Sequence, residues 1–502
     1  MKKDQALSVL SENQKKSYAY NYALSSIYLD SLTVAPRDTA AGRGEALEIL
    51  SAESYKISTD PALGEALDEL SAVSAELTPE TARQVELLKR ERDRIGKIPQ
   101  NEYVAFRRLL NDAENVWHDA KLSNDFPAFA PYIEKMVETL IRFAGYTDCG
   151  RGLSNYDSML DQYERGLRCE TLDRFFADVR STVVPLVAAI KEDGAPVNTD
   201  FLSGRWPVPA QQELSSELMR LLGIDPSHCV LGETLHPFTL EFNKYDVRIT
   251  TRYDESDVLS SMYSVIHEGG HALYELNGSD SHMYTCLAGG ISMGVHEAQS
   301  RLYENIIGRS RGFIGLVHPV MKRLFPDKME NVSADELYRA VNRCEPSLIR
   351  TEADEVTYPL HIMVRYEIER ALFNEGLRVS DLPEIWNSKM KEFLGVDVPD
   401  NSRGVLQDSH WSGGSFGYFP SYAIGSAYSA QLAQKMRSEF DFDGEIAAGN
   451  IPRITAWLSE RIYRHGCMFD PSELMENCFG GRFDPSVYTR YLSEKYSGIY
   501  RL

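Results

Sequence analysis

Apolar residues recur at three- and four-residue spacing along most of the chain. The first 140 residues show this clearly, in segments such as ETARQVELLKRERDRI and NEYVAFRRLLNDAENVWHDAKL. This spacing places apolar side chains on one face of a helix and charged side chains on the other. Proline interrupts helices, so boundaries are expected at Pro36, Pro61, Pro79 and Pro99. The pattern predicts a mainly α-helical protein.

One segment alternates with a period of two instead. Residues 238–253 read FTLEFNKYDVRITTRY, in which Phe238, Leu240 and Phe242 share one face ahead of a turn at Asn243-Lys244. β-Branched and aromatic residues favour strands, so the segment predicts a hairpin in a small antiparallel sheet. Such a sheet either caps the core or offers an edge to which an extended peptide can pair.

Composition and charge narrow the class of protein. The chain is 43% hydrophobic and 25% charged, as is ordinary for a globular protein. Its formal charge of −21, without a Lys/Arg cluster, argues against nucleic-acid binding. We find neither a membrane-spanning apolar run nor a signal-peptide core. The seven scattered cysteines lack a CxxC pair and are typical of reduced thiols. We therefore expect a cytoplasmic protein with no membrane partner.

The strongest chemical signal is His-Glu-Gly-Gly-His at residues 267–271. It lies in an amphipathic helical segment that Ser256 or Asp257 can cap, with Gly278 just past its end. Four-residue spacing puts the imidazoles of His267 and His271 on one face, where both can bind the same ion. The alternative is a helix whose histidines satisfy buried polar groups.

The residues between the two histidines favour the metal site. Glu268 follows the first ligand, and its carboxylate can accept a proton from a metal-activated water. Gly269 and Gly270 each cost about 1 kcal/mol relative to Ala inside a helix. Glycines inside a helix usually indicate that another segment packs closely against the helix there, as happens at an active-site helix.

A third ligand is expected from a second amphipathic helix, residues 292–308. A catalytic zinc takes three protein ligands and keeps one position open for water. Two neutral histidines and one carboxylate leave the ion positively charged, which lowers the pKa of that water. Glu297 would supply the carboxylate, although the chemistry alone does not exclude Glu275 or Glu304. His296 points elsewhere on the helix and is expected to support a ligand.

Further motifs carry a resemblance to a known family. Over essentially its full length the chain resembles the carboxypeptidase Taq family of metallocarboxypeptidases, the thermostable carboxypeptidases. The matching motifs, in chain order, are His236-Pro237-Phe238, Asp246-Val247-Arg248-Ile249-Thr250, His267-Glu268-Gly269-Gly270-His271, His296-Glu297-Ala298-Gln299-Ser300-Arg301, Ile349-Arg350-Thr351-Glu352-Ala353-Asp354 and Gly404-Val405-Leu406-Gln407-Asp408-Ser409-His410-Trp411.

The resemblance implies a saddle-like helical fold with a deep groove and a small sheet, assembled as a homodimer. It implies release of single amino acids from peptide C-termini with broad specificity. It also implies that Glu297 is the third ligand of a zinc ion that cobalt can replace. We expect one domain over residues 1–502, with helices 1–140 flanking the groove and a catalytic core at 230–430. The N-terminal motif departs from the family pattern at Leu29-Asp30-Ser31-Leu32-Thr33-Val34-Ala35-Pro36.

The family motifs also suggest residues that hold the peptide. A carboxypeptidase must bind a free α-carboxylate, which the planar guanidinium of arginine can do with two hydrogen bonds. Arg350 is the first candidate and Arg248 the second, and either is otherwise a structural ion pair. Gln407 is expected to contact the peptide backbone or to position His410.

An oxyanion forms during peptide hydrolysis and needs a hydrogen-bond donor in addition to the metal. His410 is the first candidate, with Tyr418 and Tyr422 behind it, unless these tyrosines are core residues. Asp354 and Glu352 are considered as acceptors for a ligand imidazole.

Two alternatives to a carboxypeptidase remain at this point. One is an endopeptidase or dipeptidase with the same ligands. The other is a catalytically silent scaffold that binds peptides in its groove. The presence of Glu268 argues against the scaffold, because a binding protein needs no general base.

Overall fold

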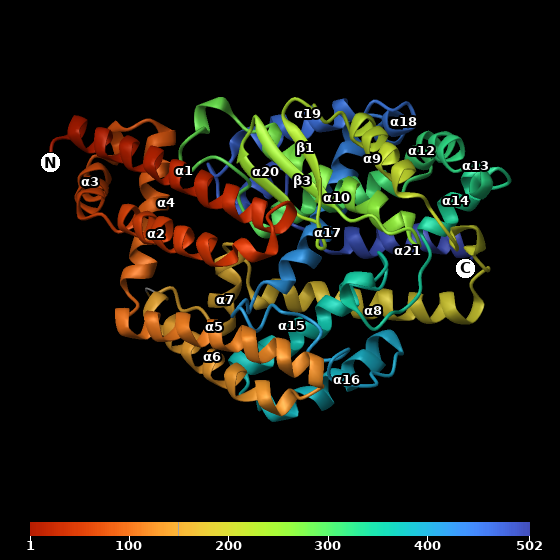
Figure 1. Ribbon diagram of the computed structural model, residues 1–502, viewed down its shortest axis with the longest axis horizontal. Coiled ribbons are helices and arrows are strands. Elements are labelled where there is room, and N and C mark those ends of the chain that lie inside the picture. Colours follow the sequence, from red (N-terminus) through yellow and green to blue (C-terminus); the bar gives the residue numbers. More distant parts are fainter. Residues whose placement is uncertain (149) are drawn as a thin grey trace.

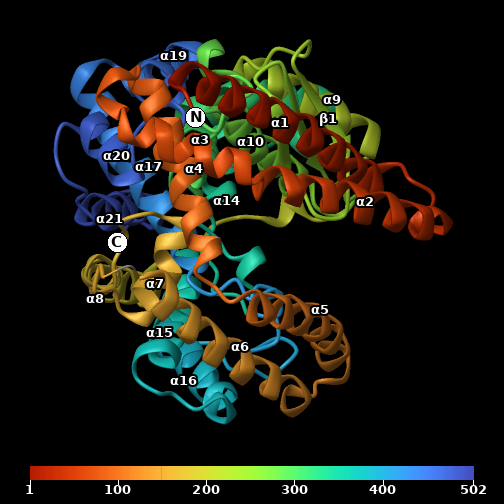
Figure 2. The same cartoon turned by 90° about the vertical axis from the view of Figure 1, so that its left-hand side faces the viewer.

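The computed structural model describes residues 1–148 and 150–502, apart from the side chains at positions 37 and 95. Cys149, one of the cysteines expected to be a structural thiol, lies outside the described residues. The protein is mainly helical, and Figures 1 and 2 show an upper and a lower half. No helix in the described ranges is both long and apolar enough to cross a membrane.

The N-terminal helices occupy one side of the upper half, at the left of Figure 1. They are α1 (Lys3–Thr33), α2 (Ala40–Ser58), α3 (Pro61–Ala72) and α4 (Pro79–Gly96). Pro61 and Pro79 each open a helix, as the sequence predicts, because proline is tolerated in the first turn. These helices have a small hydrophobic cluster of their own, made of Ala6, Leu10, Leu63, Ala66, Leu67, Leu70 and Val85.

The lower half combines helices from two distant parts of the chain (Figure 2). They are α5 (Gln100–Ser123), α6 (Phe126–Thr147), α7 (Asn155–Tyr163), α8 (Cys169–Asp193), α15 (Tyr358–Asn374) and α16 (Leu382–Leu394).

The remaining helices build the rest of the upper half around the sheet. They are α9 (Val208–Leu222), α10 (Val258–Leu276), α11 (Met293–Arg301), α12 (Arg311–Leu324), α13 (Pro326–Met329), α14 (Ala334–Val341), α17 (Phe419–Glu439), α18 (Phe442–Ala447), α19 (Ile451–Arg461), α20 (Pro471–Phe479) and α21 (Ser486–Tyr500). One large hydrophobic cluster runs through these helices and those of the lower half.

The sheet has three strands, β1 (Cys229–Glu233), β2 (Thr239–Asn243) and β3 (Asp246–Thr251), in the order β1-β3-β2. β2 and β3 form the predicted antiparallel hairpin, with the turn at Lys244-Tyr245. The prediction of a purely antiparallel sheet is wrong, because β1 pairs in parallel with β3. Parallel pairing joins segments separated by a connection, so no hairpin signal marks it in the sequence.

Candidate active site

Helix α10 carries His267, Glu268 and His271 along the sheet. The Asp257 side chain caps its N-terminus by accepting hydrogen bonds from the Leu259 and Ser260 backbone N–H groups. Its glycines allow close packing, as predicted. A Cβ on Gly270 would lie 2.8 Å from Ser300 Cα on α11, whereas a Cβ on Gly269 would meet only side-chain methyl groups of Leu222 and Ile224.

Helix α11 presents Glu297 to α10. Ser292 caps α11, and the segment that was predicted as one helix continues from Leu302 to Gly308 as a π-helix. Helix α17 holds α11 from behind, since a Cβ on Gly425 would lie 2.6 Å from Glu297 Cβ. The contact at Gly270 therefore sets the distance between α10 and α11, and the contact at Gly425 packs α11 against α17.

The side chains of His267, His271 and Glu297 converge. One candidate ligand atom from each lies within 4.8 Å of the other two. Glu297 Oε2 is 3.9 Å from His267 Nε2 and 3.7 Å from His271 Nε2. Arg301 Nε donates to the other Glu297 oxygen, Oε1, at 2.6 Å, so Oε2 remains directed toward the histidines.

Each histidine is oriented by a partner at its Nδ1 atom. His267 Nδ1 lies 2.9 Å from Glu304 Oε2, and Glu304 is also paired with Arg301 and Arg309. The pKa of Glu304 is held well below its usual value, because these cations outweigh the effect of burial. Glu304 therefore supports a histidine rather than joining the three converging groups.

His271 is oriented by a longer chain of side chains. Its Nδ1 lies 2.6 Å from His296 Nδ1, and His296 Nε2 lies 2.7 Å from Glu275 Oε1. Glu275 is thus two side chains away from the cluster. Burial holds the pKa of His271 well below its usual value, and the neighbouring histidines lower it further, so its ring is neutral.

The acceptors considered from the sequence, Asp354 and Glu352, do not fill this role. Asp354 accepts hydrogen bonds from the Glu345, Val356 and Thr357 backbone N–H groups and shapes its own loop. Glu352 is exposed. Glu304 shares a helical face with Glu297, seven residues earlier, which was the available signal for its actual role.

Glu268 lies beside the cluster and is buried. Thr239 Oγ1 on β2 donates to Glu268 Oε2 at 2.7 Å, a contact that no sequence motif indicates. Burial raises the pKa of the Glu268 carboxyl above its usual value, although nearby His267 and the Thr239 hydrogen bond oppose this. This shift favours uptake of a proton by the carboxyl, as a general base requires.

Arg350 belongs to a buried charge cluster, which we call the Arg350 cluster, with Arg365 and Asp408. Asp408 Oδ1 accepts from Arg350 Nε at 3.0 Å and Nη2 at 2.9 Å, while Asp408 Oδ2 accepts from Arg365 Nε at 2.7 Å. Two guanidinium groups share one carboxylate, so the cluster carries an excess positive charge. Arg365 and Asp408 were not singled out from the sequence.

Gln407 braces this cluster. Its side-chain oxygen accepts from the Arg350 backbone N–H and from Arg365 Nη2. Its Nε2 atom donates to the Leu348 and Arg403 carbonyls. All of its hydrogen-bonding capacity is used within the protein.

His410, Tyr418 and Tyr422 form an aromatic group next to Arg350. The His410 ring stacks on Phe419 at a centroid distance of 4.3 Å, and its Nε2 lies 3.3 Å from Tyr422 Oη. Burial lowers the pKa of His410 to about 4, so the ring is neutral at pH 7. The Tyr418 and Tyr422 rings pack edge to face at 5.1 Å.

Arg248 lies apart from this group, on β3. Its Nε and Nη2 donate to Asp246 at 2.9 and 3.0 Å, and its guanidinium lies over the Phe242 ring. This is the structural ion pair considered as the alternative for Arg248.

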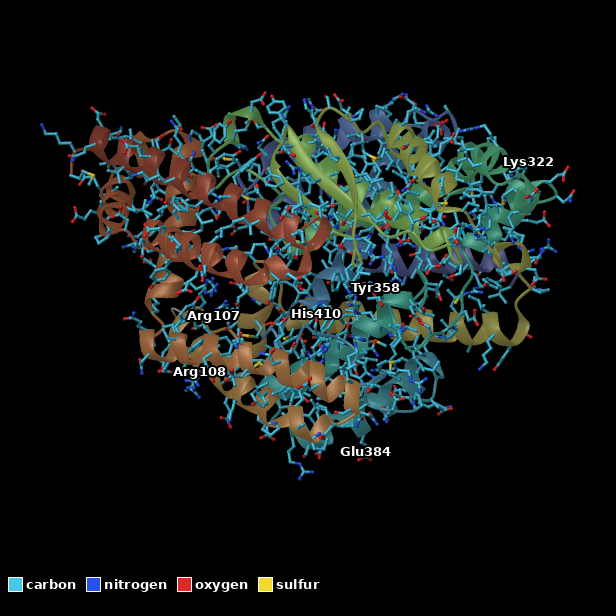
Figure 3. The ribbon with its side chains drawn as sticks, viewed as in Figure 1. Arg107, Arg108, Lys322, Tyr358, Glu384 and His410 are labelled. Carbon is cyan, nitrogen blue, oxygen red and sulfur yellow. The ribbon has the colours of Figure 1, made fainter. Side chains whose placement is uncertain are left out.

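Contacts connect the three converging groups with the Arg350 cluster. Arg301, bound to Glu297, lies over the Tyr358 ring at 4.4 Å, and Arg350 Nη1 donates to Tyr358 Oη at 3.3 Å. Figure 3 shows Tyr358 and His410 at the level where the two halves of the molecule meet. The structure thus brings together residues that are far apart in the sequence.

The three converging side chains fit a divalent metal ion. Both histidines have their Nδ1 atoms engaged and their Nε2 atoms directed at one carboxylate oxygen. Two imidazoles and a carboxylate form the donor set of a catalytic zinc site with one open position.

Comparison with known proteins agrees with this geometry. The family described as carboxypeptidase Taq (M32) metallopeptidase matches residues 9–496. Carboxypeptidase 1 of Bacillus subtilis is 39% identical over 489 residues, 97% of each chain. Thermostable carboxypeptidase 1 of Thermus thermophilus is 35% identical over 481 residues, 94% of each chain. The crystal structure of the M32 carboxypeptidase from Deinococcus radiodurans superposes with a TM-score of 0.95 at 34% identity, over 99% of this chain and 100% of that one. The chain therefore belongs to the carboxypeptidase Taq (M32) family and is a metallocarboxypeptidase.

Proposed function

We propose that the protein removes amino acids one at a time, with broad specificity, from peptides with a free C-terminus. We further propose zinc, replaceable by cobalt, as the ion at His267, His271 and Glu297. The observation that carries the proposal is the convergence of these three groups beside the buried Glu268 carboxyl.

A divalent ion held there would polarise the scissile carbonyl and make a water molecule more acidic. Glu268 accepts the proton of the attacking water, and its raised pKa favours holding that proton during the reaction. Glu268 then donates the proton to the departing amine nitrogen. Thr239 keeps the carboxyl in place by its hydrogen bond to Oε2.

Arg350 is proposed to anchor the peptide α-carboxylate. The Arg350 cluster has two cations and one anion, and a buried excess charge is costly unless an opposite charge approaches. A C-terminal carboxylate supplies that charge. The pKa of Asp408 is held well below its usual value, because the two guanidinium groups outweigh burial, so Asp408 stays ionised and cannot release Arg350 by protonation.

His410 and Tyr422 are proposed to stabilise the oxyanion of the tetrahedral intermediate, with Tyr418 contacting the substrate. Burial keeps the pKa of Tyr422 well above its usual value, so its hydroxyl remains a donor. The neutral His410 ring lies within 3.3 Å of that hydroxyl and fixes its direction.

The test is a pair of peptides that differ only in a free or amidated C-terminus. Products are followed by mass spectrometry, and bound metal is measured by elemental analysis. We expect a ladder of single-residue losses from the free acid and at least about thirtyfold slower cleavage of the amide, since a lost charge-assisted contact costs about 2–5 kcal/mol. Internal cleavage, or equal rates for the two peptides, would refute the proposal.

We also propose a cytoplasmic homodimer. Family resemblance supports the dimer, and light scattering of the purified protein checks it. All cysteines in the described part of the chain are free, as is usual in a reducing compartment.

A further inference from the structure

A cavity of about 380 Å³ lies beside the active site. We call it the β2 cavity. Helix α1, strand β2, the end of α10 and the loop from His282 to Gly289 enclose it, and Tyr18, Tyr22, Glu241, Glu275 and Tyr284 are among its lining residues. Figures 1 and 2 both show α1 alongside the sheet. The cavity does not include any of the three converging groups.

The β2 cavity shares helix α10 and strand β2 with the reaction centre. Thr239, which binds Glu268, and Glu241 are two residues apart on β2, so both face the same side of the sheet. Glu275 lines the cavity, and its carboxylate connects to His271 through His296. Glu275 follows Glu268 by seven residues, which is about 10 Å along the helix.

The cavity is acidic and lacks a compensating cation. The Glu241 side chain has no ion pair or hydrogen bond among the residues that the structure describes. Burial and the nearby Glu275 raise its pKa to about 7, although the neighbouring His296 opposes this. Lys244 also lines the cavity, but it is paired with Asp280 at 3.1 Å.

The walls of the cavity also suit a cation. The Tyr18 and Tyr284 rings pack edge to face at 4.7 Å, and the Tyr22 ring contacts Phe242 at 4.7 Å. Aromatic faces attract ammonium and guanidinium groups. Gln14 accepts a hydrogen bond from the Cys286 N–H and Tyr18 accepts one from Asn243, so these walls are held in place.

The position of the cavity indicates which part of the substrate can reach it, namely residues on the N-terminal side of the scissile bond. A carboxypeptidase has a single substrate residue beyond the scissile bond, and Arg350 is proposed to hold it. The rest of the peptide must leave the centre in another direction, and β2 is an edge strand that can pair with it. An extended chain advances about 3.3 Å per residue, so 10 Å corresponds to about three residues.

We propose that the β2 cavity binds a Lys or Arg side chain of the substrate, two or three residues before the scissile bond, with Glu241 as its ionic partner. This inference rests on the proposed carboxypeptidase function. Because side chains alternate along an extended peptide, only one of the two positions points into the cavity.

The test uses N-terminally blocked peptides that share their last two residues and are otherwise neutral. Lys, norleucine or Glu is placed two, three or five residues before the scissile bond, and kcat/KM is measured. Lys at position two or three is expected to exceed norleucine about five- to tenfold, with Glu below both. Position five should show no preference, because it lies beyond the cavity.

Variants identify the residue responsible. Glu241→Gln is expected to bring the Lys-to-norleucine ratio close to one, and Glu241→Lys to favour the Glu peptide. Glu233→Gln, which removes an exposed carboxylate on β1 of the same sheet, is the matched control and should keep the wild-type ratio. Circular dichroism confirms that each variant is folded.

The outcomes separate this inference from the proposed function. Hydrolysis of none of the peptides contradicts the carboxypeptidase proposal. Hydrolysis of all peptides with equal kcat/KM for Lys and norleucine overturns the inference alone. A Lys preference that is unchanged in both Glu241 variants, or equal at every position, also overturns it. Such a preference would reflect attraction by the overall charge of −21.

Discussion

At the residue scale, the two histidines of α10 are supported by different partners. His267 has a carboxylate, Glu304, which is itself held by two arginines, whereas His271 has a second histidine backed by Glu275. A group that accepts the Nδ1 proton fixes the tautomer and leaves Nε2 free to bind metal. Each histidine is therefore oriented to present Nε2 to an ion.

Glu268→Gln tests the proposed general base. Glutamine keeps the shape and can still accept the Thr239 hydrogen bond, but it cannot take up a proton. We expect kcat for a free-acid peptide to fall by about 10²–10⁴-fold. Bound metal per chain and the melting temperature, measured in parallel, should match wild type. Near-normal turnover by the metal-loaded variant would exclude the role.

Glu304→Gln tests the support of His267. The amide cannot neutralise Arg301 and Arg309 and accepts the imidazole proton more weakly. We expect metal affinity, measured by competition with a chelator, to fall by about 10–100-fold. Glu352→Gln, an exposed carboxylate that was the alternative acceptor, is the control. Equal affinities in the two variants would show that Glu304 does not orient the ligand.

The ligand residues could be predicted only in part from the sequence. The four-residue spacing of His267 and His271 defines their shared face without further information. Glu297 and Glu304 lie seven residues apart and therefore also share a face, so periodicity cannot choose between them. The distances from Glu297 and Glu304 to the histidines of α10 decide which of the two is the ligand. Those distances depend on how α11 packs at Gly270 and Gly425.

At the element scale, the approach of α10 to α11 depends on one glycine. Gly270→Ala would place a methyl group 2.8 Å from Ser300 Cα and 2.9 Å from the Gln299 carbonyl oxygen, both backbone atoms that cannot move aside alone. We expect a loss of about 1–3 kcal/mol of stability and weaker metal binding, because Glu297 moves away from the histidines.

Gly269→Ala is the matched control for this variant. Its Cβ meets only the side-chain carbons of Leu222 and Ile224, which can rotate, and alanine favours the helix by about 1 kcal/mol. Its melting temperature should therefore exceed that of Gly270→Ala. The reverse order would show that the close crossing is not required.

The parallel pairing of strand β1 could not be predicted from local sequence patterns. β2 and β3 are adjacent in sequence and alternate apolar and polar residues, so the hairpin could be predicted. β1 has five residues and a Gly near its end, and its partner begins 17 residues later in a parallel register, Cys229 opposite Val247. No local signal encodes that pairing.

The N-terminus of α11 holds a buried carboxyl whose charge is uncompensated. Glu164 Oε2 accepts from the Gly294 N–H at 2.9 Å, while Oε1 has no hydrogen-bond partner in the described residues. Burial raises the pKa of Glu164 from 4.5 to about 7. The folded state therefore holds a proton that the unfolded chain releases, and stability falls as pH rises from about 4.5 to 7.

Glu164→Gln should remove this pH dependence. Relative to wild type, the variant should gain up to about 3 kcal/mol of stability between pH 4.5 and pH 8, at 1.36 kcal/mol per tenfold change in proton affinity. Melting temperatures of both proteins at the two pH values measure it. Glu134→Gln, on the exposed face of α6, should show no such gain. A constant difference between variant and wild type would contradict the assignment.

At the scale of the whole molecule, the site depends on long-range placement. The Arg350 cluster and the Tyr358 end of α15 come from segments well after α10 in the chain, since α10 ends at Leu276 and the cluster runs from Arg350 to Asp408. The sequence predicts the helices and the motifs, but helix periodicity carries no information on which helices meet. Family motifs supplied that information indirectly, by marking residues that prove to be neighbours.

We expect the N-terminal helices to open independently of the large core. Their small cluster is separate from the large one, and Arg83 joins them to the rest through Asp470 and the Cys467 and Phe469 carbonyls. They also form a wall of the β2 cavity. Local unfolding with a lower free energy than global unfolding is typical of such a unit.

Leu67→Ala tests this independence. Leu67 is 1% exposed within the small cluster, and truncation of a buried leucine costs about 2–5 kcal/mol. The loss should appear as faster hydrogen exchange in residues 1–96 by at least about 30-fold, since 1.36 kcal/mol is tenfold, with unchanged exchange in α10 and α17. Leu160→Ala, fully buried in the large cluster, is the matched control and should accelerate exchange throughout that cluster. If both variants accelerate the same segments, the N-terminal helices and the active-site core unfold as one unit.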